Sequence, residues 1–293
     1  MDTTNQARPA DTGQSALWNG SAGRAWIEGQ PTLDAIFEPF EARLVEAAAA
    51  RRPRNVLDVG CGTGATTLAI ARHLGPASQC TGVDISAPMI GVARRRGEAA
   101  HATARFVRAD AQDHVFDNPR FDMVVSRFGV MFFADPVAAF ANLRRAATDD
   151  AQLHFFAWRS AAENPFMTLA ERVARDRLPD IPKSEPGAPG QFAFAEGARV
   201  RNILDASGWT DIAIEPVDVA CRFPASALTR YITQMGPLGR ALQQIDAPKR
   251  ERIVDDVRAA FEPYMDGGDV RFEAACWEVV ARSMHSQSKE SSP

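Results

Sequence analysis

Between Asn55 and Trp158, short apolar runs alternate with segments of helical spacing. The runs are almost continuous in apolar residues and cover 55–59, 79–85, 105–110, 121–126 and 152–158. Strands that are apolar on both faces are typical of a parallel sheet covered by helices on both sides. Because consecutive parallel strands are joined by right-handed crossovers, the alternation predicts an α/β fold with a mostly parallel sheet.

Helical segments flank this region. Before residue 50, an aromatic and glycine cluster is followed by apolar residues at helical spacing, namely Leu33, Ile36, Phe37, Phe40 and Leu44. Two later strands are expected at 212–223 and 272–281, with two amphipathic helices between them. A proline-rich segment at 179–190 is typical of a surface loop or lid. We expect the inserted helices, at about 225–265, to form a cap over the active site.

The composition excludes several classes of protein. A net charge of −4 and a pI near 5.8 give no basic footprint for a nucleic acid partner. The four cysteines are scattered and form no Cys-x-x-Cys pair, so we expect no metal site and a reducing, cytoplasmic setting. No apolar run approaches the roughly 18 to 20 residues of a membrane span. The first residues also lack the pattern of a secretory signal. The sequence leaves open whether the chain forms a homodimer.

The segment Val56-Leu57-Asp58-Val59-Gly60-Cys61-Gly62-Thr63-Gly64 carries the most information. A buried strand ends there in a glycine turn that opens a helix, so that backbone N–H groups can approach a ligand closely. Gly60, Gly62 and Ala65 also satisfy the dinucleotide pattern G-x-G-x-x-G/A. The glycines alone therefore do not show whether the ligand is a dinucleotide or another molecule.

Three acids stand at the carboxyl ends of successive predicted strands. Asp84 lies 24 positions after Gly60, where a carboxylate can accept the hydroxyls of a ribose. Asp58 lies within an apolar strand, where a carboxylate is costly without a partner. A cationic ligand would offset that cost and a pyrophosphate would increase it, although Asp58 could instead cap the loop. With Asp110 after the third strand, the pattern favours an adenosine that carries a cationic amino-acid portion.

The motifs VLDVGCGTG, GVDIS, RADAQD and FDMVVSRFGVMFF resemble the successive motifs of class I S-adenosylmethionine-dependent methyltransferases. The likeness is greatest to the bacterial branch of ubiquinone/menaquinone and small-molecule methyltransferases. It implies a Rossmann-like, seven-stranded sheet with its last strand antiparallel, S-adenosylmethionine as methyl donor, S-adenosylhomocysteine as product, and no metal. One departure is Thr148-Asp149-Asp150, where the family often has a Gly-Gly turn.

The resemblance also assigns the cofactor site. Asp58 and the turn Gly60, Cys61 and Gly62 would surround the methionine portion, and Asp84 would hold the ribose. Asp110, Ala111 and Gln112 would meet the adenine. Ile85 and Met89 would flank that ring as apolar walls. Ser126 and Arg127 would lie beside the amino-acid end. In related enzymes the N-terminal segment folds over the cofactor; here Trp18 and Trp26 could cover a sulfonium by cation–π attraction, or simply pack helices.

These assignments divide the chain into five parts. Residues 1–13 and 286–293 are expected to be disordered. The ordered parts are an N-terminal helical cap (14–50), an S-adenosylmethionine-binding core (51–160), and the C-terminal part of the sheet with its helical insertion (161–285).

The acceptor site is less determined. Candidates for its lining are Phe128, Met131, Trp158, Asn164, Tyr231 and Met235, several of which could equally be core residues. His154 is the one histidine that we consider as a base, against the alternative of a buried core histidine. The apolar cluster and the helical cap favour a small, partly apolar acceptor, methylated on carbon or oxygen rather than nitrogen.

Two other functions remain open at this point. An NAD(P)-dependent oxidoreductase would use the same sheet, but Asp58 and the absence of a Tyr-x-x-x-Lys pair, in a chain with two tyrosines, argue against it. A non-catalytic S-adenosylmethionine-binding protein would bind the cofactor without turnover.

Overall fold

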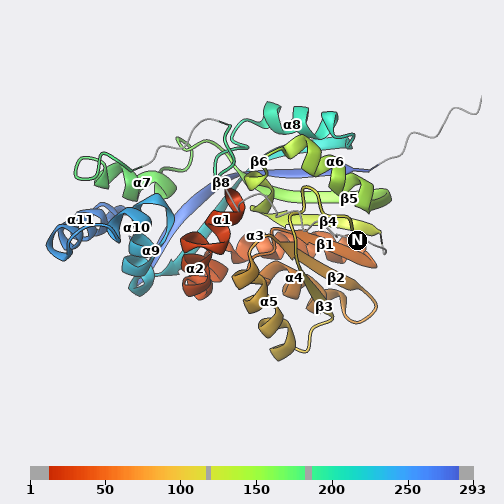
Figure 1. The fold of residues 1–293 in the computed structure, drawn as a ribbon, viewed down its shortest axis with the longest axis horizontal. Coiled ribbons are helices and arrows are strands. Elements are labelled where there is room, and N and C mark those ends of the chain that lie inside the picture. Colours follow the sequence, from red (N-terminus) through yellow and green to blue (C-terminus); the bar gives the residue numbers. More distant parts are fainter. Residues whose placement is uncertain (1–12, 117–119, 182–186, 284–293) are drawn as a thin grey trace, which may run out of the picture.

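The computed structural model describes residues 13–116, 120–181 and 187–283, and a single sheet organises them (Figure 1). Its strand order is β3-β2-β1-β4-β5-β8-β6, with the short β7 paired to β8. The strands are β1 (Asn55–Val59), β2 (Gln79–Asp84), β3 (Ala104–Arg108), β4 (Phe121–Arg127), β5 (Ala147–Trp158), β6 (Thr210–Pro224), β7 (Met265–Asp266) and β8 (Asp269–Arg282). The pairs from β3 to β5 are parallel and β8 is antiparallel to both neighbours. The predicted fold class is confirmed.

Helices cover both faces of this sheet (Figure 1). Those before β6 are α1 (Gln14–Asn19), α2 (Ser21–Glu28), α3 (Gln30–Arg51), α4 (Ala65–Leu74), α5 (Ala87–Ala99), α6 (Pro136–Ala146), α7 (Pro165–Ala174) and α8 (Gly197–Ala206). A 3-10 turn, η1 (Gly129–Phe132), follows β4. Ser86 and Asp135 cap α5 and α6, because their side chains accept hydrogen bonds from the backbone of the first turns of these helices.

The insertion between β6 and β8 is helical, as predicted. It comprises η2 (Ala225–Ala227), α9 (Leu228–Gln234), α10 (Gly236–Leu242), α11 (Ala247–Ala260) and η3 (Glu262–Tyr264). These helices gather with α7 around the long ends of β6 and β8 (Figure 1). The rings of Phe166 on α7 and Phe272 on β8 stack at 3.8 Å, which fixes this layer to the sheet.

The start of β5 differs from the expectation of a turn. Phe121 pairs with Ala147 and Met123 with Gln152, so the β5 residues between these two pairs bulge out of register. Asp150 has a φ of 62°, in the left-handed region. Thr148 to Asp150 therefore belong to a bulged first part of β5.

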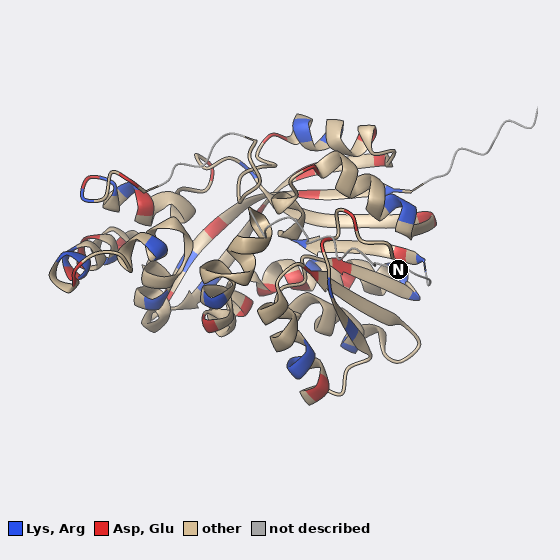
Figure 2. Cartoon of the chain, viewed as in Figure 1, with Lys and Arg blue, Asp and Glu red and all other residues tan. Residues whose placement is uncertain are grey.

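Charged side chains of both signs are mixed over the outer helices (Figure 2). None of the helices among the described residues is both long and apolar enough to cross a membrane. The segments predicted to be disordered lie, apart from Gly13, outside the described residues.

Candidate functional site

The turn after β1 is shaped by its glycines. Gly60, Gly62 and Gly64 have φ of 67°, 57° and 86°, which favour glycine. A Cβ on Gly60 would lie 2.6 Å from the Cα of Gly129, in the turn after β4. The two backbones therefore cross at a distance that only glycine allows, and the carboxyl end of β1 is left open toward a ligand.

Gly129 is a site residue that the sequence analysis missed. A Cβ there would lie 2.5 Å from the carbonyl oxygen of Val59. Ser126 Oγ donates to that same oxygen at 2.7 Å and accepts from the Gly129 N–H at 3.0 Å. Ser126 thus positions the crossing. The signal in the sequence was the glycine two positions after β4, in RFGV.

The first two strand-end acids are buried and hydrogen-bonded within the protein. Thr67 Oγ1 donates to Asp58 Oδ2 at 2.6 Å, and the N–H groups of Gly62 and Ser86 donate to the two oxygens of Asp84 at 2.9 and 2.8 Å. Burial raises the pKa of Asp58 to about 6 and also raises the pKa of Asp84. Both carboxylates therefore favour a ligand with positive charge or hydroxyl donors.

A cavity of about 490 Å³ opens beside this turn, and we call it the glycine-loop cavity. It brings together most of the predicted cofactor residues, namely Trp18, Trp26, Asp58, Gly60, Cys61, Gly62, Asp84, Ile85, Met89, Asp110, Ala111 and Arg127. Gln112 and Ser126 do not line it. Gln112 Oε1 instead accepts from the Asp135 N–H at 2.9 Å, at the start of α6.

Arg127 brings a buried positive charge to this cavity. Its guanidinium lies 5.4 Å from the centre of the Phe37 ring, and Nη1 is 3.7 Å from Glu41 Oε2. Among the described residues, Nη1 has no hydrogen-bond partner although it is buried. Burial lowers the pKa of Arg127. A buried donor without a partner is costly, so this guanidinium suits an anionic group of a ligand.

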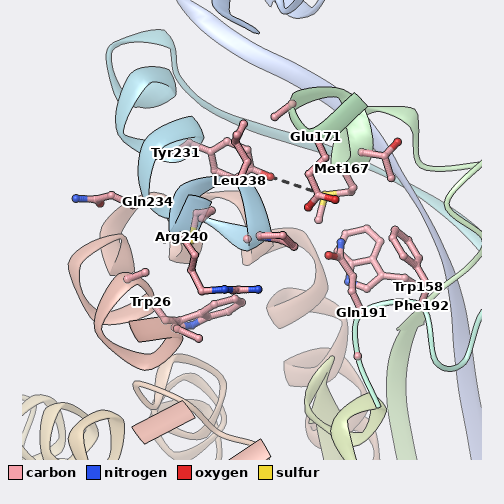
Figure 3. Close-up of a pocket in the computed structure, with 18 of the residues that line it drawn as sticks. Trp26, Trp158, Met167, Glu171, Gln191, Phe192, Tyr231, Gln234, Leu238 and Arg240 are labelled. Atoms are coloured by element: carbon pink, nitrogen blue, oxygen red, sulfur yellow. Dashed lines mark hydrogen bonds between the residues drawn. The ribbon is translucent and has the colours of Figure 1, made fainter. Parts of the chain in front are cut away.

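A second, larger cavity of about 710 Å³ lies under α7, α9 and α10, and we call it the apolar cavity (Figure 3). Five of the six residues predicted for the acceptor site line it: Phe128, Met131, Trp158, Tyr231 and Met235. Its polar lining was not predicted and consists of Glu171, Arg172, Arg175, Gln191, Gln234, Arg240 and Gln243 together with Gln14, Ser21 and Thr168.

The two cavities share a wall. The residues that line both are Gln14, Trp18, Trp26, Phe128, Phe132 and Pro189. Phe128 has a φ of 68°, which is rare for a bulky side chain, and its ring stacks on Trp158 at 4.6 Å. An aromatic partition therefore separates the cavity with the buried charges from the mainly apolar one.

The N-terminal helices hold the tryptophans in this partition. The Trp18 and Trp26 rings meet edge to face at 5.7 Å, and Trp18 packs on Phe132 at 5.1 Å. Ser86 Oγ donates to the Trp18 carbonyl at 2.7 Å, while the same hydroxyl caps α5. The start of α5 thus anchors the helical cover.

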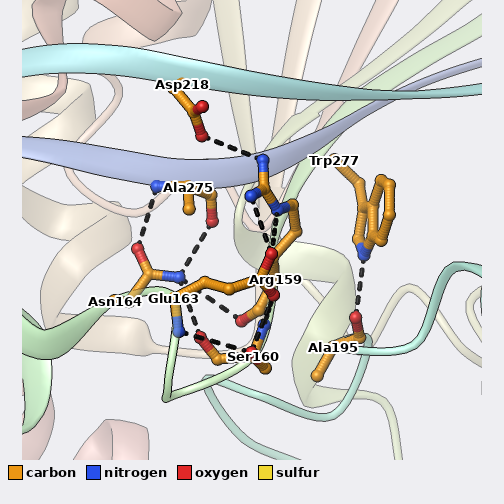
Figure 4. A network of polar contacts seen from close by, with 8 residues as sticks. All are labelled: Arg159, Ser160, Glu163, Asn164, Ala195, Asp218, Ala275 and Trp277. Atoms are coloured by element: carbon orange, nitrogen blue, oxygen red, sulfur yellow. Dashed lines mark hydrogen bonds and ion pairs between the residues drawn. The ribbon is translucent and has the colours of Figure 1, made fainter.

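Besides Gln112 and Ser126, two more predicted residues lie outside both cavities, Asn164 and His154. Asn164 exchanges two hydrogen bonds of 2.9 Å with the backbone of Ala275, which ties the start of α7 to β8 (Figure 4). His154 Nε2 lies 2.8 Å from Glu278 Oε1, and this hydrogen bond lowers the pKa of Glu278. Both side chains are therefore occupied by contacts within the sheet region. Nowhere in the described ranges do three or more metal-ligating side chains gather into a possible ion site.

Comparisons with known proteins agree with this geometry. Residues 56–150 match the family described as "Methyltransferase domain". The chain is 30% identical to the nocamycin O-methyltransferase of Saccharothrix syringae over 244 residues, which cover 80% of this chain and 87% of that protein. It is 34% identical to the demethylmenaquinone methyltransferase of Thermus thermophilus over 114 residues, 39% of this chain and about half (51%) of that enzyme's length.

Among solved structures, the fold is similar to that of the YcgJ protein of Bacillus subtilis. The TM-score is 0.54 at 16% identity, with 84% of this chain and 98% of that chain covered. The match to the Saccharothrix protein covers 80% of this chain, and so extends well beyond the residues 56–150 that match the family model. The chain belongs to the class I S-adenosylmethionine-dependent methyltransferases.

Proposed function

We propose that the enzyme binds S-adenosylmethionine in the glycine-loop cavity and transfers its methyl group to a small, partly apolar molecule in the apolar cavity. The observation that carries this proposal is the wall of six residues common to both cavities. A methyl group can pass directly only between ligands that meet. The two cavities adjoin at these six residues, so ligands bound in them could meet there.

The chemistry of the glycine-loop cavity fits the methyl donor. Asp58 would balance the positive charge of the methionine portion. Nη1 of Arg127, which makes no hydrogen bond with the described residues, would bind its carboxylate. The remaining acceptor capacity of Asp84 would serve the ribose hydroxyls. A diphosphate in place of the methionine portion would put negative charge beside Asp58, which argues against a dinucleotide.

The apolar cavity suits the transfer itself. Positive charge is dispersed as the methyl group leaves the sulfur, so a dry, aromatic surrounding disfavours competing water and holds the two reactants in line. Trp18 and Trp26 would cover the sulfonium by cation–π attraction. We propose carbon or oxygen as the methylated atom, in keeping with the quinone-type and O-methyltransferase names of the relatives.

We further propose a cytoplasmic setting, because the four cysteines are free and buried. A net charge of −4 supports a small-molecule partner rather than a nucleic acid.

Calorimetry tests the cofactor assignment. We expect S-adenosylhomocysteine to bind with one site per chain and NADH to give no heat of binding. Tight NADH binding without a response to S-adenosylhomocysteine would refute the proposal. Release of labelled methyl from S-adenosylmethionine to quinols, phenols and enols then tests the acceptor class.

A further inference from the structure

The apolar cavity contains one carboxylate among its described lining residues, that of Glu171 on α7. No histidine or cysteine lines the cavity within the described ranges. The histidine expected as a base, His154, is held by Glu278 outside the cavity. The arginines of the lining offer hydrogen-bond donors and no acceptor, so they do not serve as proton acceptors. A proton acceptor for chemistry in this cavity must therefore be sought at Glu171 or at Tyr231.

Tyr231, on α9, is a poor proton acceptor. Its hydroxyl lies 3.9 Å from the sulfur of Met167, and burial together with the nearby Glu171 raises its pKa above the ordinary value. The phenol therefore stays protonated near neutral pH. Glu171 is left as the side chain that can take up a proton there.

The surroundings of Glu171 leave its oxygens available. Its side chain makes no hydrogen bond or ion pair with any residue that the structure describes. Burial raises its pKa, and the charges of Arg175, directly after α7, and of Arg240 on α10 oppose that rise. Arg172 also lines the cavity. Glu171 and Arg240 face the same cavity from two sides (Figure 3).

We infer that Glu171 accepts the hydrogen of an acidic hydroxyl on the acceptor, a phenol or an enol, and takes its proton as the methyl group is transferred. This inference rests on the proposed function and narrows its acceptor class. The acceptor O–H bond breaks, and the proton goes to a Glu171 carboxylate oxygen. The acceptor oxygen forms a bond to the methyl carbon, the carbon–sulfur bond breaks, and the sulfur keeps the electron pair. The proton then passes to solvent.

A coloured phenol tests this contact. 4-Nitrophenol absorbs differently as phenol and as phenolate, so its spectrum reports the protonation state of the bound probe. It is titrated with protein saturated with S-adenosylhomocysteine, at a pH where the free probe is half ionised. Two negative charges side by side are costly, so an ionised Glu171 disfavours a phenolate bound next to it. We therefore expect the wild-type protein to bind the probe as the phenol.

Glu171→Gln removes that carboxylate and leaves Arg175 and Arg240 in place. We expect the ratio of phenolate to phenol in the bound probe to rise by at least about tenfold in this variant. Asp176→Asn removes an exposed carboxylate two positions after α7 and is expected to leave the wild-type ratio unchanged.

Three results would overturn the inference: equal ratios in the wild type and Glu171→Gln, phenolate in the wild type, or no binding of the probe by protein that still binds S-adenosylhomocysteine. If the wild type does not bind S-adenosylhomocysteine at all, that result would instead refute the proposed function. Equal affinity of Glu171→Gln and wild type for S-adenosylhomocysteine verifies that the variant is folded.

Discussion

Asp58→Asn is expected to stabilise the ligand-free protein. Asp58 is 2% exposed, and burial raises its pKa from 3.8 to about 6. The folded state therefore holds this proton more tightly than the unfolded state does, and its stability falls as the pH rises between these two values. At pH 7 the ionised carboxylate costs about 3 kcal/mol, since one pKa unit is worth about 1.4 kcal/mol. An asparagine avoids that cost, and its amide oxygen can still accept from Thr67.

Urea unfolding without cofactor measures this difference. The free energy of unfolding of Asp58→Asn should exceed that of the wild type by up to about 3 kcal/mol at pH 7, and by about 1.5 kcal/mol at pH 5, where Asp58 is largely protonated. Asp113→Asn, at an exposed position, is the matched control and should change neither value. A variant that is no more stable than the wild type at pH 7, or a difference independent of pH, would refute the reasoning.

The same substitution should harm function. A neutral amide cannot balance the charge of S-adenosylmethionine, so we expect at least about a tenfold rise in its dissociation constant. Calorimetry at pH 7 measures this. Greater stability together with weaker binding would identify Asp58 as a carboxylate kept for the ligand at a cost to the fold.

Three further substitutions test the site. Arg127→Met should weaken S-adenosylhomocysteine binding by about 1.5–3 kcal/mol and leave the binding of 5′-methylthioadenosine, which lacks the amino-acid portion, unchanged; equal losses for both ligands in a calorimetric titration would contradict the assignment. Asp84→Ala should weaken both ligands by about 1–3 kcal/mol, because both contain the ribose, and an unchanged affinity would show that Asp84 is not at the ribose. Gly129→Ala should lower stability by about 1–3 kcal/mol and displace the glycine turn, since its Cβ would lie 2.5 Å from the Val59 oxygen; a wild-type melting temperature and affinity would show that the backbone crossing tolerates a methyl group.

Much of the fold follows from local patterns in the sequence. The continuous apolar runs and the glycine turn define β1 at its exact bounds, and Ser86 and Asp135 mark the starts of α5 and α6. The acids of the glycine-loop cavity could also be predicted, because strand ends of a parallel sheet meet at one edge.

Other parts depend on contacts between distant segments. Asn164 follows β5 and was expected to face the acceptor, but the backbone of Ala275, 111 positions away, satisfies its amide. Glu171 lies on a helix whose inner face is decided by packing against α10 and α11, which sequence periodicity does not reveal. The role of Gly129 likewise arises only where two strand ends cross.

The partition between the cavities limits how the substrate range of this enzyme can be redesigned. Smaller side chains in place of Trp26 or Phe128 would make room for a bulkier acceptor. They would also be expected to weaken binding of the methyl donor, because both residues line both cavities. Of the two cavities, Met235 and Gln191 line the apolar cavity alone. Libraries aimed at new acceptors should therefore begin at these positions, which do not line the proposed donor site.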